Sequence, residues 1–163
     1  MQKKALVVID IQNDITKHYK EIIGHINQAI DWAAEHDIHV VYIRHYNLSA
    51  GTRTFKPDTM GAQLVPEMKI VSDIIFIKSK GNALTSEAFA DFISRNDIND
   101  FIITGADATA CVKTTCFNMR KAGYDVTVLS DCITSYDKKQ IDEMLQYYES
   151  KGSKVIIVKE LLN

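Results

Sequence analysis

The chain alternates between short apolar runs rich in β-branched residues and longer segments whose apolar residues recur at helical spacing. The apolar runs predict strands at 4–10, 38–45, 73–78, 100–105, 125–131 and 154–159. Helices are predicted between them at 16–35, 85–96, about 109–122 and 137–151. Strands of this kind, separated by helices, are typical of a parallel sheet that is buried on both faces. The sequence therefore predicts an α/β fold, with three α/β/α layers around a six-stranded parallel sheet.

Length and composition favour a single domain over residues 1–163. Of the 163 residues 46% are hydrophobic, and 19 Lys and Arg residues nearly balance 21 Asp and Glu residues. Without a block of one charge, we expect neither a nucleic-acid nor a membrane partner. No apolar stretch approaches the roughly 20 residues of a membrane span, and the start MQKKALVVID lacks the features of a signal peptide. The three cysteines form no CxxC pair, so we expect a cytoplasmic protein with reduced thiols.

One connection, residues 46–72, is much longer than the others and contains both prolines and two of the seven glycines. A connection of that length inside a compact domain is usually functional or disordered. It leaves the carboxyl end of the second predicted strand, which is the end where open α/β sheets bind ligands. We interpret it as a loop that covers a substrate, the alternative being an ordered excursion without a function.

Three reactive side chains follow different predicted strands: Asp10, Lys78 and Cys111. Because parallel strands joined by helices all end at one edge, these residues are expected to meet there. An ionised acid such as Asp10, placed among apolar neighbours, must find partners or become neutral. It could instead cap the following helix or pair with any lysine, although Asp14 is placed better for capping a helix that starts near Thr16.

Lys78 closes the buried strand DIIFIK and cannot remain unpaired in apolar surroundings. Two alternatives stay open at this point. The side chain could extend its ammonium to solvent, which is the commoner fate of a lysine at a strand end. Lys80, two residues further on, could also supply the cation.

Cys111 lies in the first turn of a predicted helix if Thr109 or Asp107 is the cap. Free amide N–H groups and the helix dipole at that position stabilise a thiolate, which lowers the thiol pKa below its free value of about 8.5. A nearby ammonium acts in the same direction. The alternative is a buried apolar cysteine, an interpretation that suits Cys116 and Cys132 better.

Five segments, in this order along the chain, resemble the isochorismatase-like cysteine hydrolases, which include nicotinamidases and N-carbamoylsarcosine amidohydrolases. They read ALVVIDIQND (5–14), FKPDTMGAQLVPEM (55–68), FIKSKGNAL (76–84), ITGADATACVKTT (103–115) and AGYDVTVLSDCITS (122–135). The resemblance implies the isochorismatase-like hydrolase fold and a catalytic triad of Asp10, Lys78 and Cys111. Lys78 rather than Lys80 matches the family lysine, because that lysine ends its strand.

The resemblance also implies a cis peptide between Ala106 and Asp107. In the family this bond aims the amide of the second residue, together with that of the cysteine, at a developing oxyanion. The backbone N–H groups of Asp107 and Cys111 are therefore expected to form an oxyanion hole.

The segment YIRHYNLSAG differs from the pattern of nicotinamidases, which resemble one another in an Asp-x-His pair and a later His that hold a metal. Here His45 stands alone, and one histidine makes a poor site for a divalent metal. We therefore predict no metal and no other cofactor. Members that act on isochorismate lack the cysteine, so amide-type hydrolysis is expected instead.

The predicted function is hydrolysis of a C–N bond in a small amide, carbamoyl or urea-like substrate through a Cys thioester. Gln12, His45, Arg53 and Phe55 are candidate substrate-binding residues. The resemblance further implies a homo-oligomer, a dimer or a tetramer. The alternative function is that of an inactive family member that binds a metabolite or a partner. A phosphoreceiver domain is disfavoured because Lys78 stands where its aspartate is needed, and a nucleotide-binding module because no glycine-rich phosphate loop follows a strand.

Overall fold

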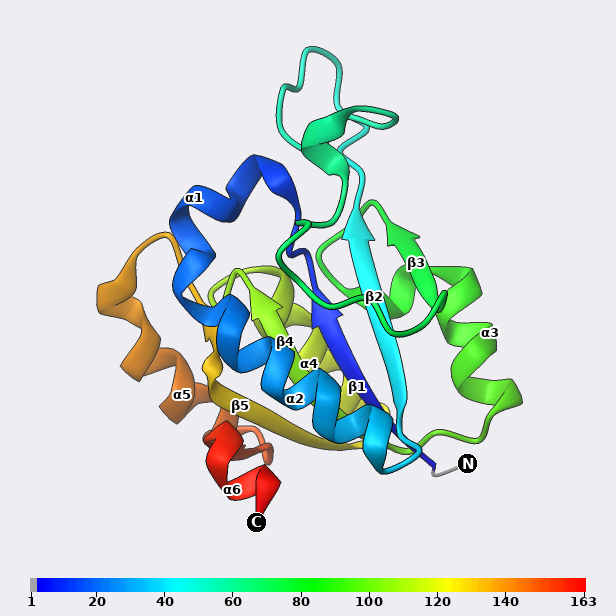
Figure 1. Ribbon diagram of the computed structural model, residues 1–163, viewed down its shortest axis with the longest axis vertical. Helices are drawn as coiled ribbons and strands as arrows, with labels where there is room; N and C mark the ends of the chain where they lie inside the picture. Colours follow the sequence, from blue (N-terminus) through cyan, green and yellow to red (C-terminus); the bar gives the residue numbers. More distant parts are fainter. Residues whose placement is uncertain (1–2) are drawn as a thin grey trace.

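The computed structural model describes residues 3–163 and contains one six-stranded parallel sheet (Figure 1). The strand order is β3-β2-β1-β4-β5-β6, and each neighbouring pair is parallel. The strands are β1 (Lys4–Ile9), β2 (His39–His45), β3 (Ile75–Lys78), β4 (Asp100–Ala106), β5 (Asp125–Thr134) and β6 (Lys154–Ile156). The predicted fold class is confirmed.

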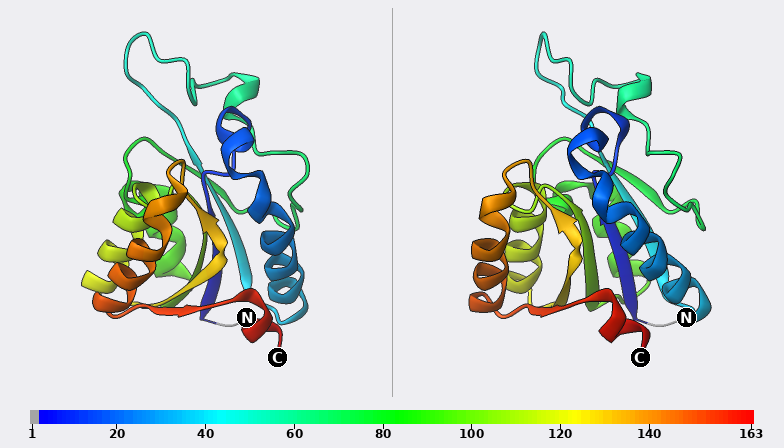
Figure 2. Two further views of the ribbon diagram at one scale, coloured as in Figure 1. Left: turned by 90° about the vertical axis from the view of Figure 1, so that its left-hand side faces the viewer. Right: turned by 60° about the vertical axis from the view of Figure 1, so that its left-hand side comes forward.

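Helices cover both faces of the sheet, as Figure 2 shows. On one face lie α2 (Ile23–Glu35) and the short α6 (Val158–Leu162), and on the other α3 (Glu87–Arg95), α4 (Cys111–Lys121) and α5 (Ile141–Ser150). Each face has its own apolar core, because the central strands β1, β2 and β4 are buried on both sides. The edge strand β3 is predicted to be buried, but Ile75 and Ile77 are exposed there. None of the helices formed by residues 3–163 has the length and hydropathy needed to cross a bilayer.

The helix predicted over 16–35 is divided in the structure. The short α1 (Thr16–Tyr19) is followed by a 3₁₀ turn over Lys20–Ile22 and then by α2. Two tertiary hydrogen bonds hold the chain at the division: the Tyr19 hydroxyl donates to Asp107, and the Lys138 ammonium donates to the His18 carbonyl oxygen. These long-range contacts hold the chain where the predicted helix is interrupted. Hydrophobic periodicity alone does not predict such contacts.

The last predicted strand, 154–159, is too long. β6 pairs with β5 over only three residues, and Val158 already belongs to α6. The Val158 N–H donates to the Asp131 carboxylate at 2.9 Å, and the Val158 side chain packs into the core on the α2 face. An apolar run at the chain end therefore begins a helix instead of extending the strand.

The connection between β2 and β3 has two parts. From Tyr46 to the 3₁₀ turn over Met60–Ala62, the chain stands away from the body at the carboxyl edge of the sheet (Figures 1 and 2). We call residues 46–62 the arm. The return segment is packed, since Val65 and Met68 are buried in the core on the α2 face and the Tyr42 hydroxyl donates to the Lys69 carbonyl oxygen.

The strand order reverses between β1 and β4, because the chain proceeds outward from β1 in one direction and later from β4 in the other. Open α/β sheets bind ligands at such a switch point, beyond the carboxyl ends of the strands. Here Gly105 makes close packing possible: its φ is +119°, and a Cβ atom would lie 2.2 Å from the Ile9 carbonyl oxygen. The ends of β1 and β4 can therefore approach only with glycine at this position.

We expect Gly105→Ala to destabilise the protein by about 2 kcal/mol or more, because alanine adds both an unfavourable positive φ and a clash with backbone. Chemical denaturation measures the change. Gly24→Ala is the matched control: a Cβ at this position would have no atom within 4 Å, and alanine inside α2 should stabilise the helix by up to about 1 kcal/mol. Equal stabilities of the two variants would contradict this account of the switch point.

Candidate active site

Asp10 directly follows β1 and takes a left-handed backbone conformation with φ +57°. Aspartate and asparagine adopt this conformation more readily than most residues. The backbone N–H of Asp10 donates to the Ile43 carbonyl oxygen at 3.0 Å, which joins this turn to β2. Asp10 is only 2% exposed, so its carboxylate lies in the protein interior at the switch point.

Lys78 ends β3, and its side chain is fully buried. The ammonium donates to Asp10 Oδ2 at 3.1 Å and to Cys111 Sγ at 3.3 Å, and its nitrogen lies 2.7 Å from His45 Nδ1. The alternative of an ammonium extended to solvent is therefore wrong, and the rival Lys80 is exposed. A lysine ammonium has three N–H donors, and Lys78 has an acceptor for each.

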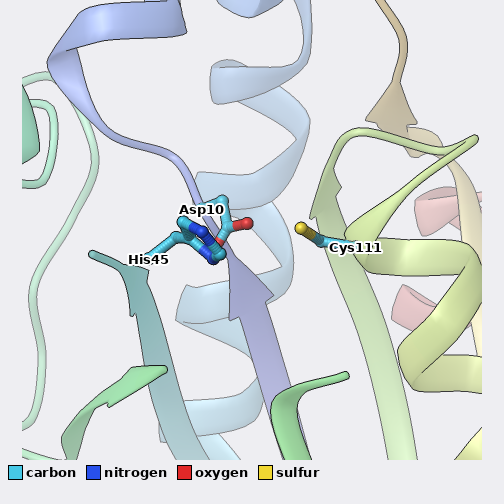
Figure 3. A group of neighbouring side chains, drawn as sticks. All are labelled: Asp10, His45 and Cys111. Atoms are coloured by element: carbon cyan, nitrogen blue, oxygen red, sulfur yellow. The ribbon is translucent and has the colours of Figure 1, made fainter. Parts of the chain in front are cut away.

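Cys111 is the first residue of α4, and its sulfur points toward Asp10 (Figure 3). The helix has Ala110 at the N-cap and no side-chain cap, so the predicted caps, Thr109 and Asp107, are wrong. The Asp107 carboxylate instead accepts hydrogen bonds from the Tyr19 hydroxyl and from the backbone N–H of Thr109. The other cysteines, Cys116 and Cys132, are buried as expected.

The pKa of the Cys111 thiol is raised to about 12, first by burial and then by the Asp10 charge, both of which outweigh the opposing effect of Lys78. Burial also raises the pKa of Asp10, against the attraction of Lys78. The expected lowering of the thiol pKa is therefore wrong, because burial and the carboxylate exceed the effects of the helix dipole and the ammonium. The raised pKa favours the neutral form of the Cys111 thiol, and the Asp10 side chain lies beside it.

His45 ends β2 and is half-buried, close to the Asp10 side chain (Figure 3). Burial and the neighbouring Lys78 ammonium lower its pKa. The ring is therefore neutral near pH 7, and its Nδ1 accepts a hydrogen bond from the ammonium. His45 is predicted from sequence to bind substrate, whereas the structure places Nδ1 against Lys78. Their strand-end positions, opposite each other in the β2–β3 register, are the signal for this contact.

Gln12 is completely buried, and both the NH₂ group and the oxygen of its side-chain amide form hydrogen bonds. Its NH₂ group donates to the carbonyl oxygens of His45 and Ala62, at 3.0 and 2.9 Å, and its oxygen accepts from the His45 N–H at 2.8 Å. The side chain thus clamps the end of β2 to the arm. This geometry does not support the predicted contact of Gln12 with a substrate.

Of the two arm residues predicted to bind substrate, Phe55 lies near the site and Arg53 is exposed. The Phe55 ring centroid lies 6.0 Å from that of His45, and its backbone N–H donates to Asp14 Oδ2 at 2.7 Å. Gly61 packs so closely on the Asp14 carboxylate that a Cβ would lie 2.0 Å from Oδ1. Asp14 therefore anchors the arm, and its predicted role as a helix cap is wrong.

The peptide between Ala106 and Asp107 is cis. Cys111 begins α4, and the first N–H groups of a helix have no acceptor within the helix itself. The backbone N–H groups of Asp107 and Cys111 remain the predicted oxyanion hole.

Asp10, His45 and Cys111 offer oxygen, nitrogen and sulfur atoms within 4.8 Å of one another, a donor set that zinc accepts. The Lys78 ammonium, however, is in hydrogen-bond contact with all three residues. A divalent ion needs ligands at about 2.0–2.3 Å and would have to displace this buried cation. These residues therefore fit the ammonium and do not fit a metal.

A family model described as "Isochorismatase domain" matches residues 4–160. The chain belongs to the isochorismatase family. An uncharacterized isochorismatase family protein of Bacillus subtilis, YrdC, is 22% identical over 156 residues, which cover 91% of this chain and 82% of that protein. The chain is thus a member of the isochorismatase-like hydrolases.

Two solved structures share the fold. Pyrazinamidase of Pyrococcus horikoshii in complex with zinc superimposes with a TM-score of 0.86 at 22% identity, covering 96% of this chain and 99% of that one. N-carbamoylsarcosine amidase from Thermoplasma acidophilum gives a TM-score of 0.84 at 19% identity, covering 96% and 97%.

The Asp10 charge raises the thiol pKa, so we expect Asp10→Asn to lower the pKa of Cys111. Asparagine keeps the left-handed backbone at this position. The measurement is the pH dependence of iodoacetamide alkylation, with adducts mapped by mass spectrometry, and Cys116 and Cys132 serve as internal controls whose reactivity should not change. A Cys111 pKa that stays the same or rises in D10N would show that Asp10 is not its proton partner.

Proposed function

We propose that this isochorismatase family member hydrolyses a C–N bond of a small amide, carbamoyl or urea-like substrate through a thioester on Cys111. One observation carries the proposal: a single buried ammonium, Lys78, touches both the Asp10 carboxylate and the Cys111 sulfur. A nucleophile beside a base, with a third group that orients both, is the arrangement that covalent catalysis requires.

In the first step Asp10 takes the thiol proton while Cys111 Sγ bonds to the substrate carbonyl carbon. The Lys78 ammonium stabilises the developing thiolate, and protonation of Asp10 removes the negative charge that raises the thiol pKa. The carbonyl π electrons move to oxygen, and the N–H groups of Asp107 and Cys111 donate to that oxyanion. The raised pKa of Asp10 suits it to this work, because a base is most effective when its pKa lies closer to the operating pH.

In the second step the oxyanion collapses, the C–N bond breaks, and protonated Asp10 gives its proton to the departing nitrogen. The product is an amine or ammonia and a Cys111 thioester. Asp10 then takes a proton from water as the water oxygen attacks the thioester carbon. The C–S bond breaks, the sulfur recovers its proton from Asp10, and a carboxylic or carbamic acid leaves.

The choice of a C–N bond is supported by the two structural relatives, since pyrazinamidase and N-carbamoylsarcosine amidase are both named as amidases. The short distance between Asp10 and Cys111 also supports the choice of a C–N bond. Proton transfer from Cys111 to the adjacent Asp10 keeps the charge of the site constant, and the same proton is then available to the leaving nitrogen.

A screen of small amides, carbamoyl compounds and ureas should detect ammonia release by the wild-type protein. Cys111→Ala should abolish the release, because the thioester cannot form. Cys116→Ala is the matched control, since that buried thiol lies outside the site and its removal should leave turnover in place. Ammonia release that persists in C111A would contradict the covalent mechanism, and substrate binding without turnover in the wild type would favour the binding-protein alternative.

Asp10→Asn separates thiolate formation from catalysis. The variant should contain more thiolate, yet kcat should fall by about 10²- to 10⁴-fold, because neither a base nor an acid remains to move the proton. Steady-state kinetics on a substrate from the screen measures kcat. If kcat rose with the thiolate content, Asp10 would have no role beyond its charge.

A further inference from the structure

We propose that His45 is a positioning residue that holds the Lys78 ammonium against Asp10 and Cys111. This inference rests on the proposed function for its kinetic consequence, but its geometry stands independently. His45 Nδ1 lies 2.7 Å from Lys78 Nζ, nearer than the Asp10 oxygen at 3.1 Å or the Cys111 sulfur at 3.3 Å. Of these three acceptors, the ring nitrogen is the nearest to the ammonium.

The three contacts use the three N–H donors of the fully buried Lys78 side chain, so a lost acceptor would leave a buried N–H without a partner. A protonated His45 would present an N–H to the ammonium instead of a lone pair, and two positive charges would then face each other. Loss of the imidazole acceptor, by protonation or by substitution, should therefore let the ammonium rotate away from Cys111.

Hydrogen bonds hold both the N–H and the carbonyl oxygen of His45, and they fix the position from which its ring extends. Gln12 accepts from the His45 N–H and donates to its carbonyl oxygen. In the β2–β3 register His45 lies opposite Lys78, and the next N–H, that of Tyr46, donates to the Lys78 carbonyl oxygen at 2.8 Å. Both side chains consequently leave neighbouring strands at the same level.

The titratable groups that face the ring come from three elements: Lys78 from β3, Asp10 from the end of β1, and Cys111 from α4. The arm contributes the apolar ring of Phe55. On β2 itself the neighbouring Arg44 is directed elsewhere, since its guanidinium donates to the Ala62 carbonyl oxygen. Lys78 opposes protonation of His45 and Asp10 favours it, so each should move the His45 titration in a known direction.

The decisive experiment compares two amides at position 45. Asparagine places its oxygen where Nδ1 stands and cannot titrate, whereas glutamine places its oxygen near the Nε2 position. We expect His45→Gln and His45→Ala to lower kcat by about 10- to 100-fold, the effect of losing one hydrogen bond to a charged group, and His45→Asn to recover most of that loss. Equal activities of H45N and H45Q would overturn the proposal.

A second measurement needs no substrate and separates this inference from the proposed function. Nitrogen NMR of the histidines should show His45 with its proton on Nε2 and with a pKa below 6.5. Lys78→Met should raise that pKa, and Asp10→Asn should lower it. A proton on Nδ1, or a His45 pKa that Lys78→Met leaves unchanged, would refute the positioning role even if the protein hydrolyses amides. The expected NMR result in a protein that hydrolyses none would leave the positioning role standing and remove the proposed function.

Discussion

The buried ammonium of Lys78 is the interaction on which the site depends. It connects β1, β2, β3 and α4 through side chains of Asp10, His45 and Cys111, four elements that are far apart in sequence. An ion pair in the interior is costly to break, because removal of one partner typically destabilises a protein by about 3 to 5 kcal/mol. Loss of either charge would therefore destabilise the protein, and the ammonium also opposes the rise in the pKa of the Cys111 thiol.

The topology explains why these residues meet. Parallel strands bring their carboxyl ends to one edge, and the reversal of strand order between β1 and β4 opens that edge beside Asp10. Gly105 lets the two strands approach closely, and the clamp formed by Gln12 attaches the end of β2 to the arm. Asp14 then anchors the arm through Phe55, next to His45. These contacts fix the surroundings of Asp10 and His45 from several elements.

The sequence predicts the sheet and the meeting of Asp10, Lys78 and Cys111, because hydrophobic periodicity and the geometry of parallel strands are local rules with long-range consequences. It does not predict what depends on tertiary contacts. The first helix is divided where Tyr19 donates to Asp107 and Lys138 donates to the His18 carbonyl oxygen. Val158 starts a helix because its N–H donates to the Asp131 carboxylate. The raised pKa of Cys111 depends on burial and on a carboxylate whose distance no sequence pattern gives.

The central claim is that Cys111 carries the acyl group during turnover, and trapping that intermediate tests it most directly. Acid quenching in the first turnovers, followed by intact-mass and peptide mass spectrometry, should find the wild-type protein heavier by the acyl part of its substrate, with the addition on Cys111. Turnover of the same substrate with no adduct, or with an adduct on another residue, would contradict the account.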